Sequence, residues 1–296
     1  MRSGKGKIPG SGILAGILIF WALVWLAAWA TGGLDPEIDM GARLLAPGPG
    51  HPLGTDDLGR DLLGTVACAH GLSMVLGLVV AAGSLLIGGL AGMVAGWCGG
   101  RLDGWIMRAV DLVLAFPGFI LAIGISACLD PGWRSLVAIL VFCGWPGYAR
   151  LVRVEVMKFR TAGFVLAALS YNASGPRIAC CHLLPHVLPF VMVQASQGVG
   201  EVILAETGLN FLGVGLGPTV PSLGVLISMG MDHLFDRPHL LIFPGLMLVS
   251  LVFFFILLAH RLHGRLAARG GHLLGDTKKK GNRHRLFPLD IKADVP

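Results

Sequence analysis

Long apolar stretches constrain this chain of 296 residues more than any other feature. An α-helix rises about 1.5 Å per residue, so most of the stretches suffice to cross the roughly 30 Å hydrocarbon layer of a bilayer. Backbone groups in lipid must be paired within the protein, and these stretches lack the alternation of β-barrel strands. The sequence therefore predicts an all-α membrane protein with about six transmembrane helices. The predicted spans are 13–30, 72–97, 105–128, 135–149, 184–209 and 240–260.

Basic residues fall mainly on one side of these predicted spans. With the N-terminus in the cytoplasm, 19 of the 23 Lys and Arg residues lie on the cytoplasmic side and 4 on the other. Cytoplasmic loops of membrane proteins carry this excess of positive charge. We therefore expect both termini and residues 150–182 in the cytoplasm, with 31–64 and 210–236 outside. Topology accounts for the net charge of +6, and no nucleic-acid partner is expected.

The chain divides into three parts. Residues 1–64 hold an anchor helix and an external loop, 65–262 the transmembrane core, and 263–296 a basic tail that we expect to be disordered and drawn to anionic lipids. The first span could instead be a cleaved signal peptide. Its Trp21, Trp25 and the lack of a small-x-small cleavage site favour a retained anchor.

The sequence lacks the motifs of several chemical functions. The chain has no G-x-x-x-x-G-K-[ST] sequence for binding ATP, so ATP hydrolysis would have to come from a partner. The six cysteines lack the spacing of a disulfide framework. Cys180, Cys181 and His182 are adjacent, which suits tetrahedral metal coordination poorly. We expect no metal site and no cofactor.

A short helix is predicted within residues 150–182, at about 164–175. Its centre places Val165, Ala168, Leu169 and Asn172 along one face, and Ser174, Gly175 and Pro176 then end it. The segment is too polar for lipid and too apolar for a solvated linker. We therefore expect another protein to cover the apolar face.

This segment resembles the EAA loop of ABC importer membrane subunits. The resemblance implies that the short helix docks in a groove of a cytoplasmic ATPase. Two positions depart from the family pattern: Leu166 stands where glutamate is usual and Asn172 where glycine is usual. Asn tolerates the left-handed backbone that glycine would adopt, so the turn is expected to survive. The matching positions are Ala167, Ala168, Ile178, Leu184 and Pro185.

Residues 54–61, with the sequence GTDDLGRD, resemble an external segment of the peptide and nickel importers within that superfamily. We expect Thr55 to cap a helix beginning at Asp56, and the glycines to permit tight turns. The charges form either internal ion pairs or a substrate contact, and we predict a role at the external mouth. The residues concerned are Gly54, Thr55, Asp56, Gly59, Arg60 and Asp61.

Further segments resemble the same branch in order and spacing from about residue 35 to 260. They are GRLD at 100–103, MRAVD at 107–111, LAFP at 114–117, GWPGYARLVR at 144–153 and AETGLNFLGVG at 205–215. The resemblance, to the C-type subunit of the dipeptide importers, implies a type I importer permease fold in the bacterial inner membrane. It also implies a homologous second permease subunit, two ATP-binding cassette subunits and an external solute-binding protein as partners.

Three ionisable residues lie within or beside the predicted spans: Arg108, Asp111 and Glu206. Such groups are normally paired and turned to the protein interior, so we expect an ion pair between Arg108 and Asp111. Glu206 either lines the pathway or bonds to the glycine-rich turn that follows it.

Alternative classes are a secondary transporter, which would show an inverted repeat with paired broken helices, and an intramembrane hydrolase, which would need catalytic groups at matched depth. The sequence shows neither pattern, and the resemblance implies a transport subunit that is not itself an enzyme. The cargo stays open between di- or oligopeptides and nickel or a nickel chelate.

Overall fold

The structure is a computed structural model that describes residues 11–31, 38–217 and 220–283, with side chains as far as Gly264. The described part is almost wholly helical, with one isolated β-bridge between Thr55 and Asp61. The elements are α1 (Ser11–Ala30), the 3-10 turn η1 (Met40–Ala42), α2 (Leu62–Cys98), α3 (Gly100–Leu114), α4 (Gly118–Ser126), α5 (Trp133–Arg160), α6 (Gly163–Ser170), α7 (Gly175–Ile178), the π-helical turn η2 (Ala179–Leu183), α8 (Leu184–Phe211), α9 (Leu223–Asp232) and α10 (His239–Arg283).

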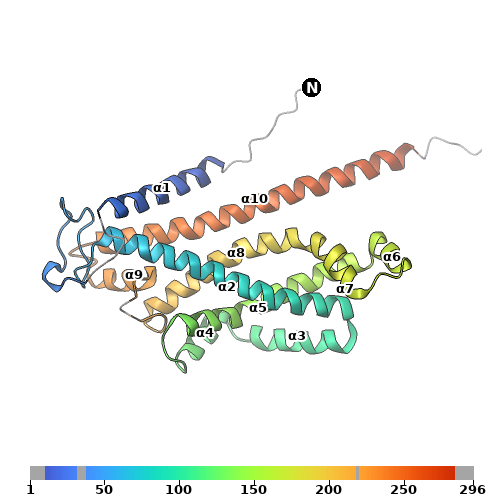
Figure 1. Cartoon of the computed structure of the whole chain (residues 1–296), viewed down its shortest axis with the longest axis horizontal. Helices are drawn as coiled ribbons and strands as arrows, with labels where there is room; N and C mark the ends of the chain where they lie inside the picture. Colours follow the sequence, from blue (N-terminus) through green and yellow to red (C-terminus); the bar gives the residue numbers. More distant parts are fainter. Residues whose placement is uncertain (1–10, 32–37, 218–219, 284–296) are drawn as a thin grey trace, which may run out of the picture.

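Five helices are long and apolar enough to cross a membrane, and the bent pair α3 and α4 makes a sixth span if counted as one. Figure 1 shows α2, α5, α8 and α10 running along the length of the bundle, with α1 beside α10 and α3 beside α5. The prediction of an all-α protein with about six spans is therefore confirmed.

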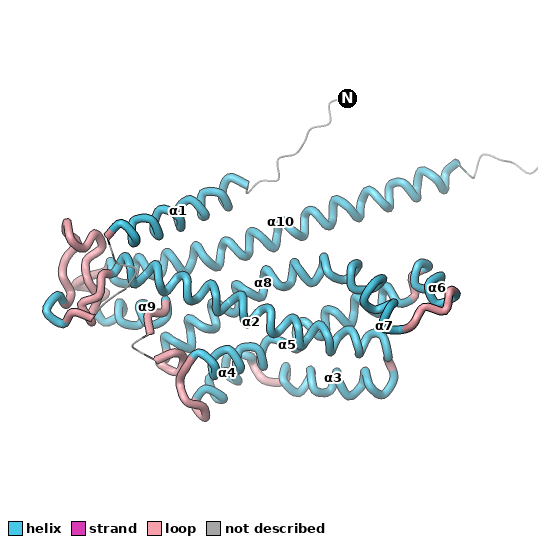
Figure 2. Tube along the Cα trace, in the orientation of Figure 1, coloured by secondary structure: helices cyan, strands magenta, loops and turns pink. Residues whose placement is uncertain are grey.

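The bundle has two ends with different structures. At one, which we call the α9 end, α9 packs beside the loop of residues 38–61. At the other, which we call the α6 end, lie α6, α7 and the junction of α2 with α3 (Figure 2). The start of α1 and the far end of α10 both point toward the α6 end (Figure 1).

Helices extend beyond the apolar stretches from which the spans were predicted. α2 starts ten residues earlier than expected, at Leu62, and α5 continues through the basic stretch to Arg160. Arg, Lys and Glu are good helix formers, so a span continues as helix where its hydropathy falls. As a consequence, the predicted loop 150–182 is mostly helical, and its irregular part lies close to α6.

The third predicted span is broken. α3 and α4 meet at 78°, at a break that contains Phe116 and Pro117. Proline lacks a backbone N–H and disfavours helical backbone in the residue before it. The sequence analysis predicted a single span over 105–128 and missed this bend.

Glycines of α2 form a close helix contact with α5. A Cβ added at Gly88 would meet Tyr148, one at Gly92 would meet Val152, and one at Gly96 would meet Val156. The three glycines are four residues apart and so share one face of α2. Small residues at this spacing let helices approach closely in lipid. These glycines therefore serve close packing between α2 and α5.

The first helix is tied to the bundle by tryptophans. The indole Nε1 of Trp21 donates to Ser250 Oγ of α10 at 3.0 Å, and that of Trp25 donates to His70 Nδ1 of α2 at 3.4 Å. Trp21 is buried and belongs to the main apolar cluster of α1, α2, α8, α9 and α10. These bonds fix the depth of α1 against its neighbours.

The tail differs from expectation where it is described. The sequence predicts disorder from residue 263, whereas the backbone of α10 is helical as far as Arg283. Extending an existing helix needs no new nucleus, and the Leu, Ala, Arg and Lys residues here are good helix formers. Residues 284–296 lie outside the described residues.

Candidate functional site

The α6 helix is anchored to the bundle by one side chain. Val165 is fully buried and packs in an apolar cluster with Val152 and Val156 of α5 and with Ile178. Ala168, one turn later, is half-buried against the same cluster. One face of α6 is therefore part of the permease's own core.

The opposite face of α6 is apolar and open. Leu166 is 53% exposed, Ala167 beside it is exposed, and Tyr171, just after the helix, is 89% exposed. The sequence analysis placed Val165 and Ala168 on a face that another protein would cover, whereas the subunit's own core covers Val165 fully and Ala168 in part. Both faces are apolar, so only the tertiary packing shows which one the core covers.

Asn172 ends α6 in the conformation expected from sequence. Its φ is +58°, in the left-handed region that glycine usually occupies. The Asn172 N–H donates to the Leu169 carbonyl at 2.9 Å and the Ala173 N–H to the Ala168 carbonyl at 3.1 Å. These two bonds form a Schellman motif, which satisfies the last carbonyls of a helix. The turn therefore survives the replacement of glycine.

An aromatic cluster connects α6 to the two spans beside it. The ring of Phe164 stacks on His186 of α8 with centroids 4.5 Å apart, and Phe159 of α5 lies 5.5 Å from His186. His186 also bonds through Nδ1 to the His182 carbonyl oxygen at 2.7 Å. The cluster packs α6 against both α5 and α8. The sequence analysis considered His182 only beside Cys180 and Cys181, as a poor metal site, and did not identify this cluster.

The remaining predicted positions of this segment lie at the start of the fifth span. Ile178 is buried in the cluster of Val165, whereas Leu184 and Pro185 are exposed on the first turn of α8. Between them the backbone forms the π-helical turn η2. Such turns insert an extra residue into a helix and are frequent at functional sites.

At the α9 end, Thr55 is buried and holds the loop together. Its hydroxyl accepts from the Leu45 N–H at 2.7 Å and donates to the Ala42 carbonyl at 2.5 Å. It does not cap a helix at Asp56, as sequence analysis expected. The capping residue is Asp61, whose carboxylate accepts from the Gly64 N–H at 3.0 Å and so begins α2.

The charged residues of this loop are bonded to one another. Arg60 is 2% exposed, and its Nε donates to Asp56 Oδ2 at 2.7 Å. Asp56 Oδ1 accepts from the backbone N–H groups of Leu58 and Arg60, both at 2.9 Å. Of the two interpretations left open by the sequence, this geometry supports internal ion pairs over contact of these two charges with a solute.

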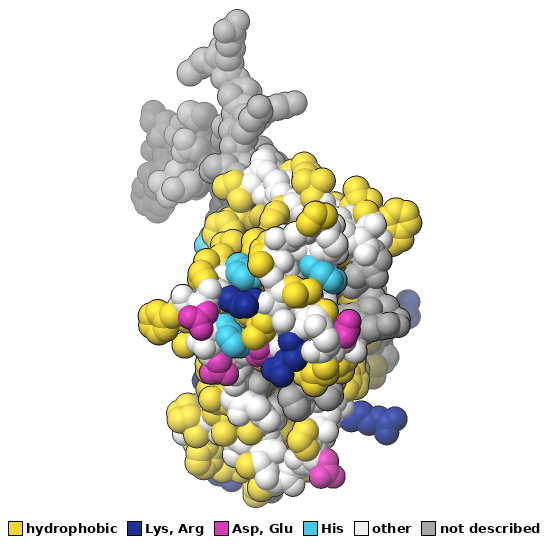
Figure 3. Space-filling view, turned by 90° about the vertical axis from the view of Figure 1, so that its left-hand side faces the viewer, with side chains coloured by type: hydrophobic (Ala, Val, Ile, Leu, Met, Phe, Trp, Pro, Cys, Tyr) yellow, Lys and Arg dark blue, Asp and Glu magenta, His cyan; other side chains and the backbone are white. Residues whose placement is uncertain are grey.

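Two glycines make the loop possible. Gly54 and Gly59 have φ of +80° and +75°, and a Cβ at Gly59 would collide with the backbone of Asp39. The loop is then tied to the bundle, because Asp57 Oδ1 lies 2.8 Å from His233 Nε2 at the end of α9. Figure 3 views this end, where acidic, basic and histidine side chains gather among apolar ones.

Ion pairs join α3 to α5 near the α6 end. Arg153 bonds both oxygens of Asp103, at 2.5 and 2.6 Å, and Arg150 Nη2 donates to Asp111 Oδ1 at 2.7 Å. The expected pair of Asp111 with Arg108 is wrong. Arg108 instead lies over the ring of Trp105, 5.2 Å from its centroid. Sequence analysis considered partners on the same helix, whereas α5 brings two arginines closer.

Glu206 is a structural group in this fold. It is fully buried and accepts from Ser73 Oγ of α2 at 3.0 Å and from Asn210 Nδ2 at 2.6 Å. Asn210 Oδ1 in turn accepts from the Leu216 N–H at 2.6 Å. The glutamate therefore supports the glycine-rich turn through Asn210, as one of the two sequence interpretations held, and does not line an open surface.

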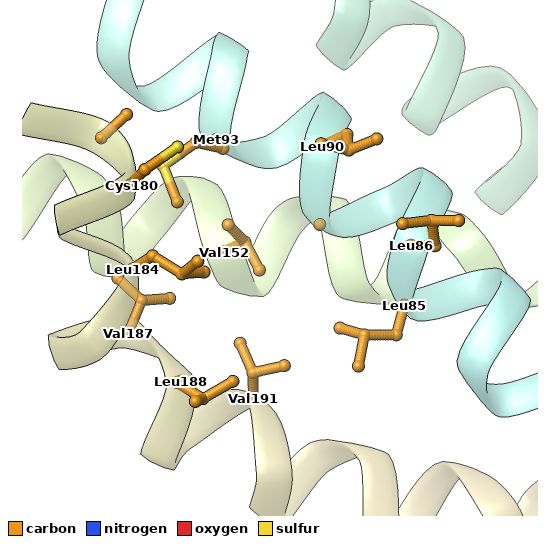
Figure 4. Close-up of a pocket in the computed structure, with 12 residues that line it drawn as sticks. Leu85, Leu86, Leu90, Met93, Val152, Cys180, Leu184, Val187, Leu188 and Val191 are labelled. Atoms are coloured by element: carbon orange, nitrogen blue, oxygen red, sulfur yellow. The ribbon is translucent and has the colours of Figure 1, made fainter. Parts of the chain in front are cut away.

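An apolar groove of about 300 Å³ lies between α2, α5 and α8 (Figure 4). Leu86, Leu90 and Met93 line one side and Val152, Leu184 and Leu188 the other. Among the described residues, no group of three or more His, Cys, Asp or Glu side chains is arranged to hold a metal ion. The groove therefore offers apolar contacts and no coordinating cluster.

The arrangement defines a class of protein. A bundle of about six apolar spans, with paired charges between spans and a small apolar helix exposed at one end, is that of a multi-pass membrane protein. Residues 88–270 match the model of the family described as the binding-protein-dependent transport system inner membrane component. The chain belongs to that family, and it is a permease of the bacterial inner membrane.

Curated relatives cover most of the chain. A putative peptide transport system permease protein of Brucella suis is 36% identical over 79% of both chains. The dipeptide transport system permease protein DppC of Alkalihalophilus pseudofirmus is 32% identical over 86% of this chain and 84% of its own length. The nickel transport system permease protein NikC of Escherichia coli is 33% identical, with coverage of 84% and 91%.

The fold is also found in a solved structure. A chain of the MetNI methionine ABC transporter aligns with a TM-score of 0.55 and 17% identity, over 66% of this chain and 92% of that chain. This similarity supports the type I importer permease fold that the sequence motifs imply.

Proposed function

We propose that this chain forms one half of the translocation pathway of an ATP-driven importer of peptides. Its partners in that assembly are a homologous second permease subunit, two ATP-binding cassette subunits and an external solute-binding protein. The relatives named as peptide and dipeptide permeases support the cargo. The α6 end faces the cytoplasm and the α9 end faces outward, in agreement with the excess of basic residues at the former.

The observation that carries the proposal is the construction of α6. Val165 fixes one face in the permease core, while Leu166 and Ala167 on the other face are open. An exposed apolar patch on a rigid element marks a protein contact. We assign this face to the ATPase. Closure of the ATPase pair would then push α6, and the aromatic cluster would transmit the movement to α5 and α8.

The docking role is tested with Ala167→Asp. The added carboxylate would enter the ATPase contact, and a charge buried without a partner there costs about 2–5 kcal/mol. Co-purification of the ATPase with the permease should fall sharply, while the amount of permease in the membrane stays normal. Arg177→Ala, which removes an exposed side chain from α7, is the matched control. Unchanged co-purification and transport with Ala167→Asp would exclude α6 as the docking element.

The cargo is tested by uptake into proteoliposomes that contain the assembled transporter and its binding protein. We expect labelled di- or oligopeptide to accumulate when ATP is supplied. Nickel is the second candidate, because the nickel permease of Escherichia coli is as similar in sequence as the dipeptide permease. Uptake of nickel without uptake of peptide would replace the proposed cargo and leave the docking role untouched.

A further inference from the structure

One ion pair between α3 and α5 is exposed on the surface of the bundle, away from its α6 end. The side chains of Arg150 and Asp111 are 54% and 65% exposed, although their charged ends are 2.7 Å apart. The second pair, between Arg153 and Asp103, is much less exposed. The open pair is therefore not part of the subunit's core, and its depth decides what surrounds it.

The apolar sequence of α2 beside the pair indicates that it lies within the hydrocarbon layer, so the membrane boundary falls beyond Arg150, the first residue of the segment 150–182 that the sequence analysis expected in the cytoplasm. Arg150 is ten residues before the end of α5, and Asp111 is eleven residues after the start of α3, or about 15 Å along either helix. Gly92 of α2 packs against the residue before Arg150, about 9 Å from the end of that helix. α2 is apolar throughout this stretch, which indicates lipid on its outer side.

The two sides of α5 differ at this level. Val152, two residues from Arg150 and about 200° around the helix, lines the apolar groove of Figure 4. The groove is lined only by apolar side chains, glycine and cysteine. An exposed ion pair is unfavourable in lipid, so the side of α5 that carries Arg150 faces either water or another protein subunit.

α3 shows the same division. Arg108, Asp111 and Ala115 lie three and seven residues apart on one exposed strip, while Trp105 and Leu112 lie on a neighbouring exposed strip that is apolar. A charged side chain facing lipid at mid-depth costs about 2.5–3.5 kcal/mol, so such residues face a protein interior or a water-filled cavity. Arg108, Asp111 and Arg150 together form one continuous polar surface, which we call the wall.

We propose that Asp111, Arg150 and Arg108 line the water-filled translocation pathway in its half near the α6 end. This inference rests on the proposed function and identifies side chains that the cargo would pass. The wall holds two guanidinium groups and one carboxylate, so its net charge is positive. It suits a solute that carries a carboxylate, such as the free C-terminus of a peptide, and it disfavours a bare divalent cation.

Gly147 is a suitable reporter. It is one turn before Arg150 on the exposed side of α5, and a Cβ added there meets nothing within 4 Å. The experiment introduces Gly147→Cys into the assembled transporter, with the six natural cysteines replaced. A membrane-impermeant anionic methanethiosulfonate is added at the α6 end. Leu112→Cys, on the apolar strip of α3, is the matched control.

We expect Gly147→Cys to react at least about tenfold faster than Leu112→Cys, because a thiosulfonate reacts with the thiolate, which forms in water and not in lipid. Equal rates at the two positions would overturn the assignment of the wall. The outcome does not depend on the cargo, so a failure of peptide uptake and a failure of this test are separate results.

The sign of the net charge of the wall is tested with a cationic methanethiosulfonate of similar size. Relative to a free thiol in solution, Gly147→Cys should favour the anionic over the cationic reagent. The preference should fall when Arg150→Gln is added and rise when Asp111→Asn is added. A preference for the cationic reagent, or one that neither substitution changes, would overturn the positive wall and its match to carboxylates.

Discussion

The two loop regions of this permease differ in the side chains that they bury and in those that they expose. The loop of residues 38–61 at the α9 end buries Asp56 and Arg60, pairs them with each other and is tied to α9 through Asp57 and His233. The segment around α6 buries Val165 and leaves Leu166 and Leu169 open. A loop whose polar groups are satisfied internally needs no partner for its stability. A short helix with apolar side chains on its open face gains from being covered.

Mutations in the two loops are therefore expected to affect different properties of the protein. Substitutions in the loop at the α9 end should act on the stability of the permease. Substitutions in α6 should divide by face, with the inner face acting on stability and the outer face on assembly. The four predictions below test this division, starting with the largest expected effect.

Arg60→Met should produce the largest loss of stability. It leaves Asp56 buried without its charged partner, and breaking one side of a buried pair costs about 3–5 kcal/mol. Thermal unfolding of the purified permease in detergent should shift strongly downward. Arg43→Met, which removes an exposed charge from the same loop, is the control. If both variants unfold at the same temperature, the loop is not held by this pair.

Ala168→Asp should destabilise the permease itself. Ala168 is half-buried on the inner face of α6, and an unpaired polar group in such a place costs about 1–3 kcal/mol. Thermal unfolding should shift downward, whereas Ala167→Asp on the outer face should leave the unfolding temperature unchanged. A stable Ala168→Asp variant that merely loses the ATPase would restore the contact face predicted from sequence.

Asn172→Val should weaken the end of α6. The backbone is left-handed here, which costs a β-branched residue about 1–2 kcal/mol. We expect faster proteolysis near residue 172 in the isolated permease. Asn172→Gly should be at least as resistant as the unmodified chain, because glycine adopts this conformation without strain. Equal cleavage of the valine and glycine variants would show that the turn does not depend on the left-handed residue.

Leu166→Glu should have the smallest effect on stability, less than about 1 kcal/mol. The position is exposed, and a negative charge in the first turns of a helix is favoured by about 0.3–1 kcal/mol. Because the side chain lies on the proposed contact face, its effect on ATPase co-purification reports how that face is covered. Retained binding indicates a contact that accommodates the family's usual glutamate. Complete loss, as with Ala167→Asp, would mean that Leu166 is buried in the complex.

Local chemistry was enough to predict several features from the sequence. The apolar stretches gave about six spans, because lipid leaves the backbone few alternatives to helix. The chemistry of Asn indicated a left-handed turn at 172. The family resemblance agrees with the family that the comparisons show. Each of these depends on neighbours in sequence or on a recurring motif.

Only the tertiary structure decided which groups meet. Asp111 pairs with Arg150, from a helix 39 residues away in sequence, and Thr55 bonds to backbone groups ten and thirteen residues before it. The faces of α6 are similar in hydrophobicity, and packing in a cluster with side chains of α5, α7 and α8 determines that Val165 is inside and Leu166 outside. The residues of each stretch determine whether that stretch is stable in lipid, and so whether it forms a span. Which side chains pair, and which face of a helix is buried, depend on helices that are distant in sequence, so no single stretch determines them.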